Sequence, residues 1–220
     1  RIIKAYEDYD YPAIFQAANQ LITVDLSAFY VDVTKDRMYT FGAKSEARRS
    51  GQTAMFIIVD GLARLLAPVL SVTMDELWRM LPGSREESVH MALFPRDLDQ
   101  WKDDALLERW AALSAVRDQV NLQLEEKRKD KTIAANLSAR VSIGALGETA
   151  ALLKQYEPFL PTLFGVSEVQ LKPGDGVTVE RATGTKCERC WRYVPSVSGE
   201  PERQGLCPRC VEALAEPVSL

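Results

Sequence analysis

Four cysteines near the C-terminal end, Cys187, Cys190, Cys207 and Cys210, follow the pattern C-x2-C-x16-C-x2-C and are the only cysteines in the chain. Each pair places two thiolates on one turn, and the 16-residue connection can fold back to complete a tetrahedral shell. The spacing is typical of a zinc site. Because protein would fill all four metal positions, we expect one structural Zn2+ without a catalytic role.

Two other chemistries use four cysteines. Two disulfides are one alternative, but they are typical of small secreted domains, whereas these cysteines crowd one end of a 220-residue chain with no apparent signal peptide. Iron in a rubredoxin-like site is the other, since Cys207-Pro-Arg-Cys210 could form such a knuckle.

The net charge of -4 argues against a general electrostatic hold on nucleic acid, so any such binding must use local patches. Apolar runs are all too short to span a membrane. We therefore expect a cytoplasmic protein with reduced thiols. The sequence begins at Arg1 with residues that resemble the interior of a helix, so we expect it to be a fragment of a longer polypeptide.

The first part of the chain predicts a helical bundle. Apolar residues recur at helical spacing from Tyr11 to Ile22, and the nearly all-apolar segment 53–66 predicts a central helix. Thr73 and Glu76 have the spacing of a capping box, with Val72 placed as part of a hydrophobic staple.

The remainder predicts a long helix and a small α/β module. Leu106 to Leu124 show helical periodicity, whereas Ala139, Val141 and Ile143 alternate as in a strand. Further strands are expected around 166–171 and 177–179, with a helix over 147–159. The predicted fold class is mainly α: a helical bundle with linker (1–98), the long helix and α/β module (99–183), and a zinc ribbon (184–220).

We predict no catalytic residue. The chain has one histidine, His90, and lacks a phosphate-binding glycine loop, while metal would claim every cysteine. These residues favour a binding module.

Aromatic and basic residues around the first cysteine pair are candidates for RNA binding. Trp191, Arg192 and Tyr193 follow Cys190 directly, and Arg189 precedes it. A ring can stack on an unpaired base while a guanidinium holds its phosphate. Alternatively, Trp191 packs over the metal, because small zinc modules bury few apolar groups.

Basic patches are weaker candidates, since ion-paired helix surfaces and helix C-termini also gather such residues. They are Lys35, Arg37, Arg48, Arg49, Lys127, Arg128 and Lys131.

Several motifs in order resemble the C-terminal part of bacterial-type isoleucyl-tRNA synthetases. The likeness includes Asp25-Leu-Ser-Ala-Phe-Tyr30, Lys35-Asp-Arg-Met-Tyr39, Asp75-Glu-Leu-Trp78 and Lys186-Cys-Glu-Arg-Cys-Trp191. Met38 and Ala134 depart mildly from the usual leucine and glycine. Essentially the whole chain is covered.

This resemblance implies an anticodon-binding helical domain, a junction module and a tRNA-binding zinc ribbon of a class I ligase that uses ATP. The catalytic and editing domains would lie upstream in the same polypeptide, so the fragment alone is expected to be an inactive monomer whose partner is isoleucine tRNA. The ribbon also resembles the zinc finger of formamidopyrimidine-DNA glycosylases, which leaves a DNA-repair alternative. A stand-alone zinc adaptor that binds protein is another.

Overall fold

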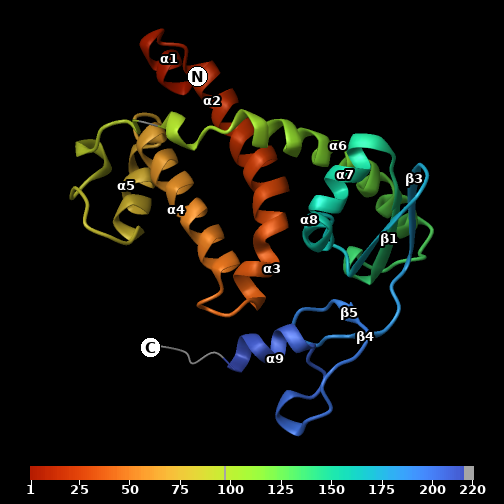
Figure 1. Cartoon of the computed structure of the whole chain (residues 1–220). Helices are drawn as coiled ribbons and strands as arrows, with labels where there is room; N and C mark the ends of the chain where they lie inside the picture. The colour runs from red at the N-terminus through yellow and green to blue at the C-terminus, as the bar shows by residue number, and fades with distance from the viewer. Residues whose placement is uncertain (97, 216–220) are drawn as a thin grey trace. The chain divides into compact units, whose positions relative to one another are not determined.

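The computed structural model describes residues 1–96 and 98–215, which form two compact units. The first comprises residues 1–32 and 46–102, and the second comprises residues 33–45 and the described residues from 103 onward. The predicted fold class is confirmed: helices dominate and a small sheet module follows (Figure 1). Four cysteines lie together near the C-terminal end. The predicted three-part division at 98 and 183 stays a prediction.

Helices make up the regular structure described in the first unit. They are α1 (Ile2–Glu7), α2 (Tyr11–Gln20), the π-helix η1 (Leu21–Val31), α4 (Glu46–Leu66), α5 (Ser71–Met80) and the 3-10 helices η2 (Val89–Met91) and η3 (Leu98–Trp101). No helix among the described residues of the chain is long and apolar enough to cross a membrane.

The core of this unit gathers around Trp78, which is 2% exposed. Its Nε1 donates to the carbonyl of Glu86 at 2.8 Å, which satisfies the polar atom of the buried ring. The Tyr6 hydroxyl similarly donates to the carbonyl of Leu65 at 2.8 Å. The other buried members are Ala5, Ile14, Ala18, Ala63, Leu66, Ala67, Met74 and Val89.

The predicted stripe from Tyr11 to Ile22 is only partly correct. Ile14 and Ala18 are buried, whereas Phe15 is 71% exposed and Ile22 is 41% exposed. From Leu21 the backbone winds as a π-helix, which changes the angular step between residues and turns the stripe away from the core. Sequence periodicity assumes one constant step, so it misplaced Ile22. Phe15 precedes the π-helix and lies on the exposed side of α2.

Two predicted helix starts are wrong. Helix α4 begins at Glu46 instead of residue 53, and Phe56 on it is exposed, so the helix is not buried all round. Helix α5 begins at Ser71, two residues before Thr73, and no side chain caps it. Val72 is 71% exposed, so it cannot form the predicted staple.

The second unit joins α3 to an α/β module and to a cysteine-bearing segment. Its elements are α3 (Asp32–Thr40), α6 (Asp104–Lys129), η4 (Asn136–Ser138), β1 (Ala139–Gly144), α7 (Gly147–Gln155), η5 (Glu157–Phe159), α8 (Leu160–Leu163), β2 (Glu168–Lys172), β3 (Gly176–Arg181), β4 (Thr185–Lys186), β5 (Tyr193–Val194), η6 (Pro201–Arg203) and α9 (Pro208–Ala215).

Strand β1 is central in a three-stranded sheet of order β2-β1-β3. It runs parallel to β2, with Val141 opposite Val169, and antiparallel to β3, with Val141 opposite Val179. The chain between β1 and β2 contains α7, η5 and α8, as a parallel pair requires a crossover connection. The predicted strand is confirmed, and Ala139, Val141 and Ile143 are all buried; Ser142 is buried as well, so burial does not alternate along the whole of this central strand.

We call residues 184–215 the cysteine ribbon. Strands β4 and β5 pair antiparallel within it, with Thr185 opposite Val194 and Lys186 opposite Tyr193. Helix α9 follows and carries the last cysteine, Cys210, on its first turn. The ribbon thus places the first cysteine pair in the turn of a short hairpin and the second at the start of a helix.

Candidate metal centre and nucleic-acid interface

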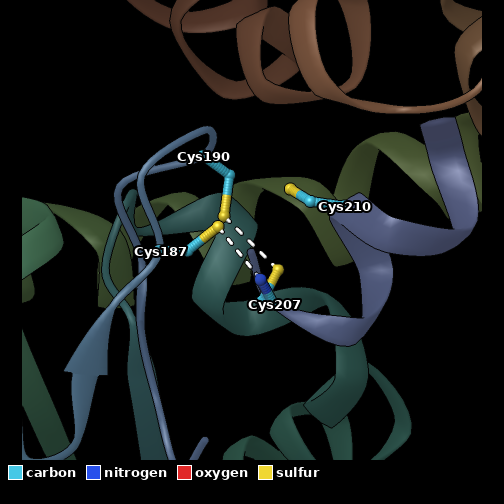
Figure 2. Close-up of side chains that lie close together, drawn as sticks. All are labelled: Cys187, Cys190, Cys207 and Cys210. Atoms are coloured by element: carbon cyan, nitrogen blue, oxygen red, sulfur yellow. Dashed lines mark hydrogen bonds between the residues drawn. The ribbon is translucent and has the colours of Figure 1, made fainter. Parts of the chain in front are cut away.

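The four predicted cysteines converge on one point. Their sulfur atoms all lie within 4.8 Å of one another, and Figure 2 shows the side chains pointing toward a common centre from the hairpin and from the start of α9. All four are buried and none forms a disulfide. Val194 and Leu206 are the partly buried apolar residues that pack against them.

The spacing of these sulfur atoms fits a tetrahedral metal shell. A zinc–sulfur bond of about 2.3 Å places two ligand sulfurs of a regular tetrahedron about 3.8 Å apart. The Sγ atoms of Cys190 and Cys207 lie 3.7 Å apart, close to that value and far from the bond length of a disulfide. The donor set therefore fits Zn2+ held by Cys187, Cys190, Cys207 and Cys210.

Backbone groups favour a thiolate at Cys187. Burial raises the pKa of this thiol, but donation from the N–H groups of Cys190, Cys207 and Arg189 outweighs burial and lowers the pKa to about 6. At Cys190, burial raises the pKa to about 12, with a further increase from the charges of Cys210 and Cys207. Four such groups are stable as thiolates together only beside a cation, which a divalent metal supplies.

Trp191 does not pack over the cysteines. Its side chain is 60% exposed and its φ is 63°, a left-handed conformation that few tryptophans adopt. The turn is held by donation from Trp191 N to the carbonyl of Cys187 at 2.9 Å. Lys186 Nζ lies 5.5 Å from the ring centroid, so a cation accompanies the exposed ring.

The two candidate arginines beside Trp191 make intramolecular contacts. Arg192 has a side chain only 14% exposed; it pairs with Asp36 at 3.2 Å and donates to Thr162 Oγ1 at 3.2 Å. Arg189 donates to the backbone carbonyls of Tyr39 and Thr40. These arginines therefore hold the protein together, which leaves Trp191 as the most accessible of the predicted group.

Tyr193 is half-buried in β5. Its N–H donates to Ser167 Oγ at 2.7 Å, which connects the cysteine ribbon to the segment that precedes β2. Among the described residues, no contact of the Tyr193 hydroxyl supports a role in RNA binding.

The basic candidates fall in both units. Lys35 and Arg37 lie on α3, where Lys35 is exposed and Arg37 lies 4.8 Å from the centroid of the Phe159 ring. Arg48 and Arg49 belong to α4 of the first unit, and only Arg49 is well exposed. Their role in RNA binding stays a prediction.

The basic end of α6 carries local ion pairs. Lys127 pairs with Asp130 at 3.2 Å, and Arg128 pairs with Glu125. Lys131 is exposed with a φ of 63° just after the helix. These contacts agree with the simpler account of a charged helix C-terminus.

Sequence reasoning missed three residues near the ribbon. Asp36 and Arg209 form a two-bond pair, with Arg209 Nη1 and Nη2 donating to Asp36 at 2.7 and 3.0 Å. Tyr39 is 80% exposed at the end of α3. Alternating charge in Lys35-Asp36-Arg37 signals an ion-paired surface, but nothing in a sequence identifies a partner more than 150 residues away.

Known proteins give an independent comparison. A family model described as the anticodon-binding domain of tRNA ligase matches residues 1–143. The isoleucine–tRNA ligase of Syntrophotalea carbinolica is 44% identical over 98% of this chain and 25% of its own length. That of Geobacter sulfurreducens is 40% identical over 97% of this chain and 24% of its own length.

The isoleucine–tRNA ligase of Dichelobacter nodosus is also 40% identical, over 96% of this chain and 23% of its own length. The chain thus spans about a quarter of the length of these curated relatives. The predicted resemblance to isoleucyl-tRNA synthetases is confirmed, and the DNA-repair and adaptor alternatives are not favoured.

Proposed function

Because the chain belongs to the anticodon-binding domain family of tRNA ligases, we propose that it binds transfer RNA as one part of an isoleucine–tRNA ligase. The helical first unit would address the anticodon stem and loop, and the cysteine ribbon would add contacts to the RNA. ATP use, aminoacylation and editing would belong to other domains of the same polypeptide. The proposal also includes a monomeric state and a cytoplasmic location; the latter agrees with four cysteines that form no disulfide.

The exposed ring of Trp191 carries the proposal for the cysteine ribbon. The ring stands on a turn fixed by a backbone hydrogen bond, next to Lys186. A rigid exposed ring loses little entropy when a base stacks on it, and a neighbouring cation can meet the phosphate. An acidic chain needs only a few such contacts when a larger RNA surface contributes the rest of the affinity.

Replacement of Trp191 tests this role. Trp191→Ala should weaken binding of isoleucine tRNA on the order of 10-fold, because base–aromatic stacking contributes about 1–3 kcal/mol. The measurement is fluorescence anisotropy with labelled tRNA on the zinc-loaded chain. Leu146→Ala is the control, since Leu146 is 69% exposed, lies in the second unit and belongs to the α/β module, to which no RNA contact is assigned. Equal effects of the two substitutions would contradict a specific role for Trp191.

The same titration includes a metal control. Trp191→Ala should leave the bound zinc unchanged, because the ring is exposed and Val194 and Leu206 cover the cysteines. Loss of zinc in this variant would show that Trp191 is structural and would remove the stacking interpretation.

We further propose one structural Zn2+ at the four cysteines, without a catalytic role. Chelation should unfold residues after about Gly184, since structural zinc supplies on the order of 10 kcal/mol to a unit this small. Elemental analysis should give one zinc per chain, and limited proteolysis should then cut the ribbon only after chelation. A ribbon that resists protease when metal-free would overturn the structural role, and stoichiometric iron would overturn the choice of metal.

A further inference from the structure

Three arginines of the cysteine ribbon meet the C-terminal end of α3, within the second unit. Arg189 lies inside the first cysteine pair, Arg192 follows it, and Arg209 lies inside the second pair. Asp36 accepts from Arg209 at 2.7 and 3.0 Å and pairs with Arg192 at 3.2 Å. One carboxylate therefore joins both cysteine knuckles to the helix.

Burial makes these contacts consequential. The side chain of Asp36 is 18% exposed, that of Arg192 is 14% exposed, and that of Arg209 is 31% exposed. Thr40 completes the group, since its Oγ1 donates to Asp36 Oδ1 at 2.7 Å and accepts from Arg209 at 3.2 Å. Removal of the only carboxylate in this group would leave two guanidinium charges partly buried beside each other, which is unfavourable.

Arg189 serves the helix end in a second way. The last carbonyls of an α-helix have no partner within the helix and carry its negative dipole. At α3 these include the carbonyls of Tyr39 and Thr40, and Arg189 donates to both. Arg209 adds a face contact, with its Cζ 4.8 Å from the centroid of the Phe41 ring.

The same arginines are positioned by the metal-binding turns. Arg189 Nη1 lies 3.6 Å from Cys210 Sγ, so an arginine of the first knuckle reaches a sulfur of the second. A metal that holds the two knuckles together would therefore also hold the three guanidinium groups in place. In metal sites generally, outer hydrogen-bond partners orient the ligands. Here the metal-bound turns would orient the partners.

We propose that Asp36 is a positioning residue that docks the metal-loaded cysteine ribbon on the end of α3, so that residues 33–45 and Trp191 meet tRNA as one rigid surface. The tRNA part of this inference rests on the proposed function; the docking part does not. Arg189, Arg192 and Arg209 act mainly on the protein itself and not on phosphate.

The sign of the effect on RNA affinity separates docking from direct phosphate contact. Asp36→Asn keeps the side-chain shape but removes a negative charge. If the arginines bound phosphate directly, this variant would bind RNA more tightly, because their charge would be freed. Docking predicts weaker RNA binding, on the order of 10-fold, because residues 33–45 and Trp191 would no longer be held in a fixed relative position.

Hydrogen exchange on the zinc-loaded chain measures docking without RNA. Asp36→Asn should speed amide exchange in 37–42 and in the cysteine ribbon at least about 10-fold, with zinc retained. Chelation of the unmodified chain should speed exchange in 37–42 as well. Glu180→Gln is the matched control: it removes the same charge from the exposed Arg140–Glu180 pair of the same unit and should change neither exchange in 37–42 nor tRNA affinity.

A second variant tests the pairing itself. Arg209→Lys keeps the charge but loses the two-pronged geometry, so it should reproduce the effects of Asp36→Asn. The double variant should be less impaired than the sum of the two single effects, because both remove one interaction.

The outcomes distinguish the parts of the inference. Unchanged exchange in 37–42 after Asp36→Asn overturns the docking role. Faster exchange with unchanged or tighter tRNA binding, while Trp191→Ala weakens binding, overturns the positioning role. If neither variant alters tRNA affinity and exchange still rises, the RNA role proposed for the ribbon fails and the docking role stands.

Discussion

Backbone conformation at single residues decides whether the cysteine ribbon can form. Gly184 enters β4 with a φ of +96°, and a Cβ there would lie 2.2 Å from the carbonyl oxygen of Val194. Gly205 has a φ of +76°, and its Cβ would lie 2.7 Å from the Glu188 side chain. The first conflict involves backbone atoms that cannot move aside, so glycine is required at 184.

Gly184→Ala should therefore destabilise the ribbon by at least about 2 kcal/mol, through strain at positive φ and displacement of β5. Zinc should transfer faster to a chromogenic chelator, which is the measurement. Gly199→Ala is the control, because Gly199 has open space around the Cβ position and lies in the same ribbon. Equal transfer rates for the two variants would contradict this explanation.

At the scale of elements, periodic apolar patterns predicted helices and strands more accurately than helix-end signals did. Long helix α6 and strand β1 were predicted well, since both elements form and their predicted core residues are buried: Leu113, Val116, Val120 and Leu124 in α6, and Ala139, Val141 and Ile143 in β1. The predicted capping box of α5 does not form, because the helix begins at Ser71 and Thr73 and Glu76 therefore lie inside it.

Asp103 is the N-cap of α6, and its Oδ1 accepts from the N–H of Leu106 at 2.9 Å. Asp103→Ala should cost about 1 kcal/mol of unfolding free energy, because a helix-end donor loses its partner. Chemical denaturation followed by circular dichroism measures the change. Asp118→Ala, at an exposed position inside the same helix, should not destabilise the protein, because alanine has a higher helix propensity than aspartate. A similar loss in both variants would indicate a general charge effect instead of capping.

At the scale of the whole molecule, charge pairing explains how an acidic chain can carry many arginines near its proposed RNA surface. Arg189, Arg192 and Arg209 are engaged by the end of α3, so they add little free positive charge. Under the proposed function, affinity must then come from placed groups such as Trp191 and from RNA contacts made by other domains; the curated relatives are about four times as long as this chain.

The pH dependence of docking follows from Asp36. Burial raises the pKa of this carboxyl, but the hydrogen bonds from Arg209 and Thr40 and the charge of Arg192 outweigh burial, and the pKa is lowered overall. A lowered folded-state pKa means that the stabilisation is complete above the unfolded value of about 3.9 and is lost as the pH falls through the folded value.

We therefore expect a constant difference in unfolding free energy between the unmodified chain and Asp36→Asn from about pH 8 to 5, with a decrease only below about 4. Denaturant titrations of the zinc-loaded proteins at each pH give this difference. Bound zinc is measured in parallel, because protons also compete for the thiolates. A difference that shrinks between pH 7 and 5 while zinc stays bound would contradict the lowered pKa.

The four-cysteine cluster, the long helix, the central strand and the family resemblance could all be predicted from the sequence. These depend on residue type at short spacing, and short spacing survives folding unchanged. The exposure of Trp191, the contacts of Arg189 and Arg192 with α3, and the pairing of Asp36 with Arg209 could be seen only in the folded chain. Those contacts join residues about 150 positions or more apart, and whether an arginine meets a carboxylate, a carbonyl or RNA depends on which groups folding brings beside it.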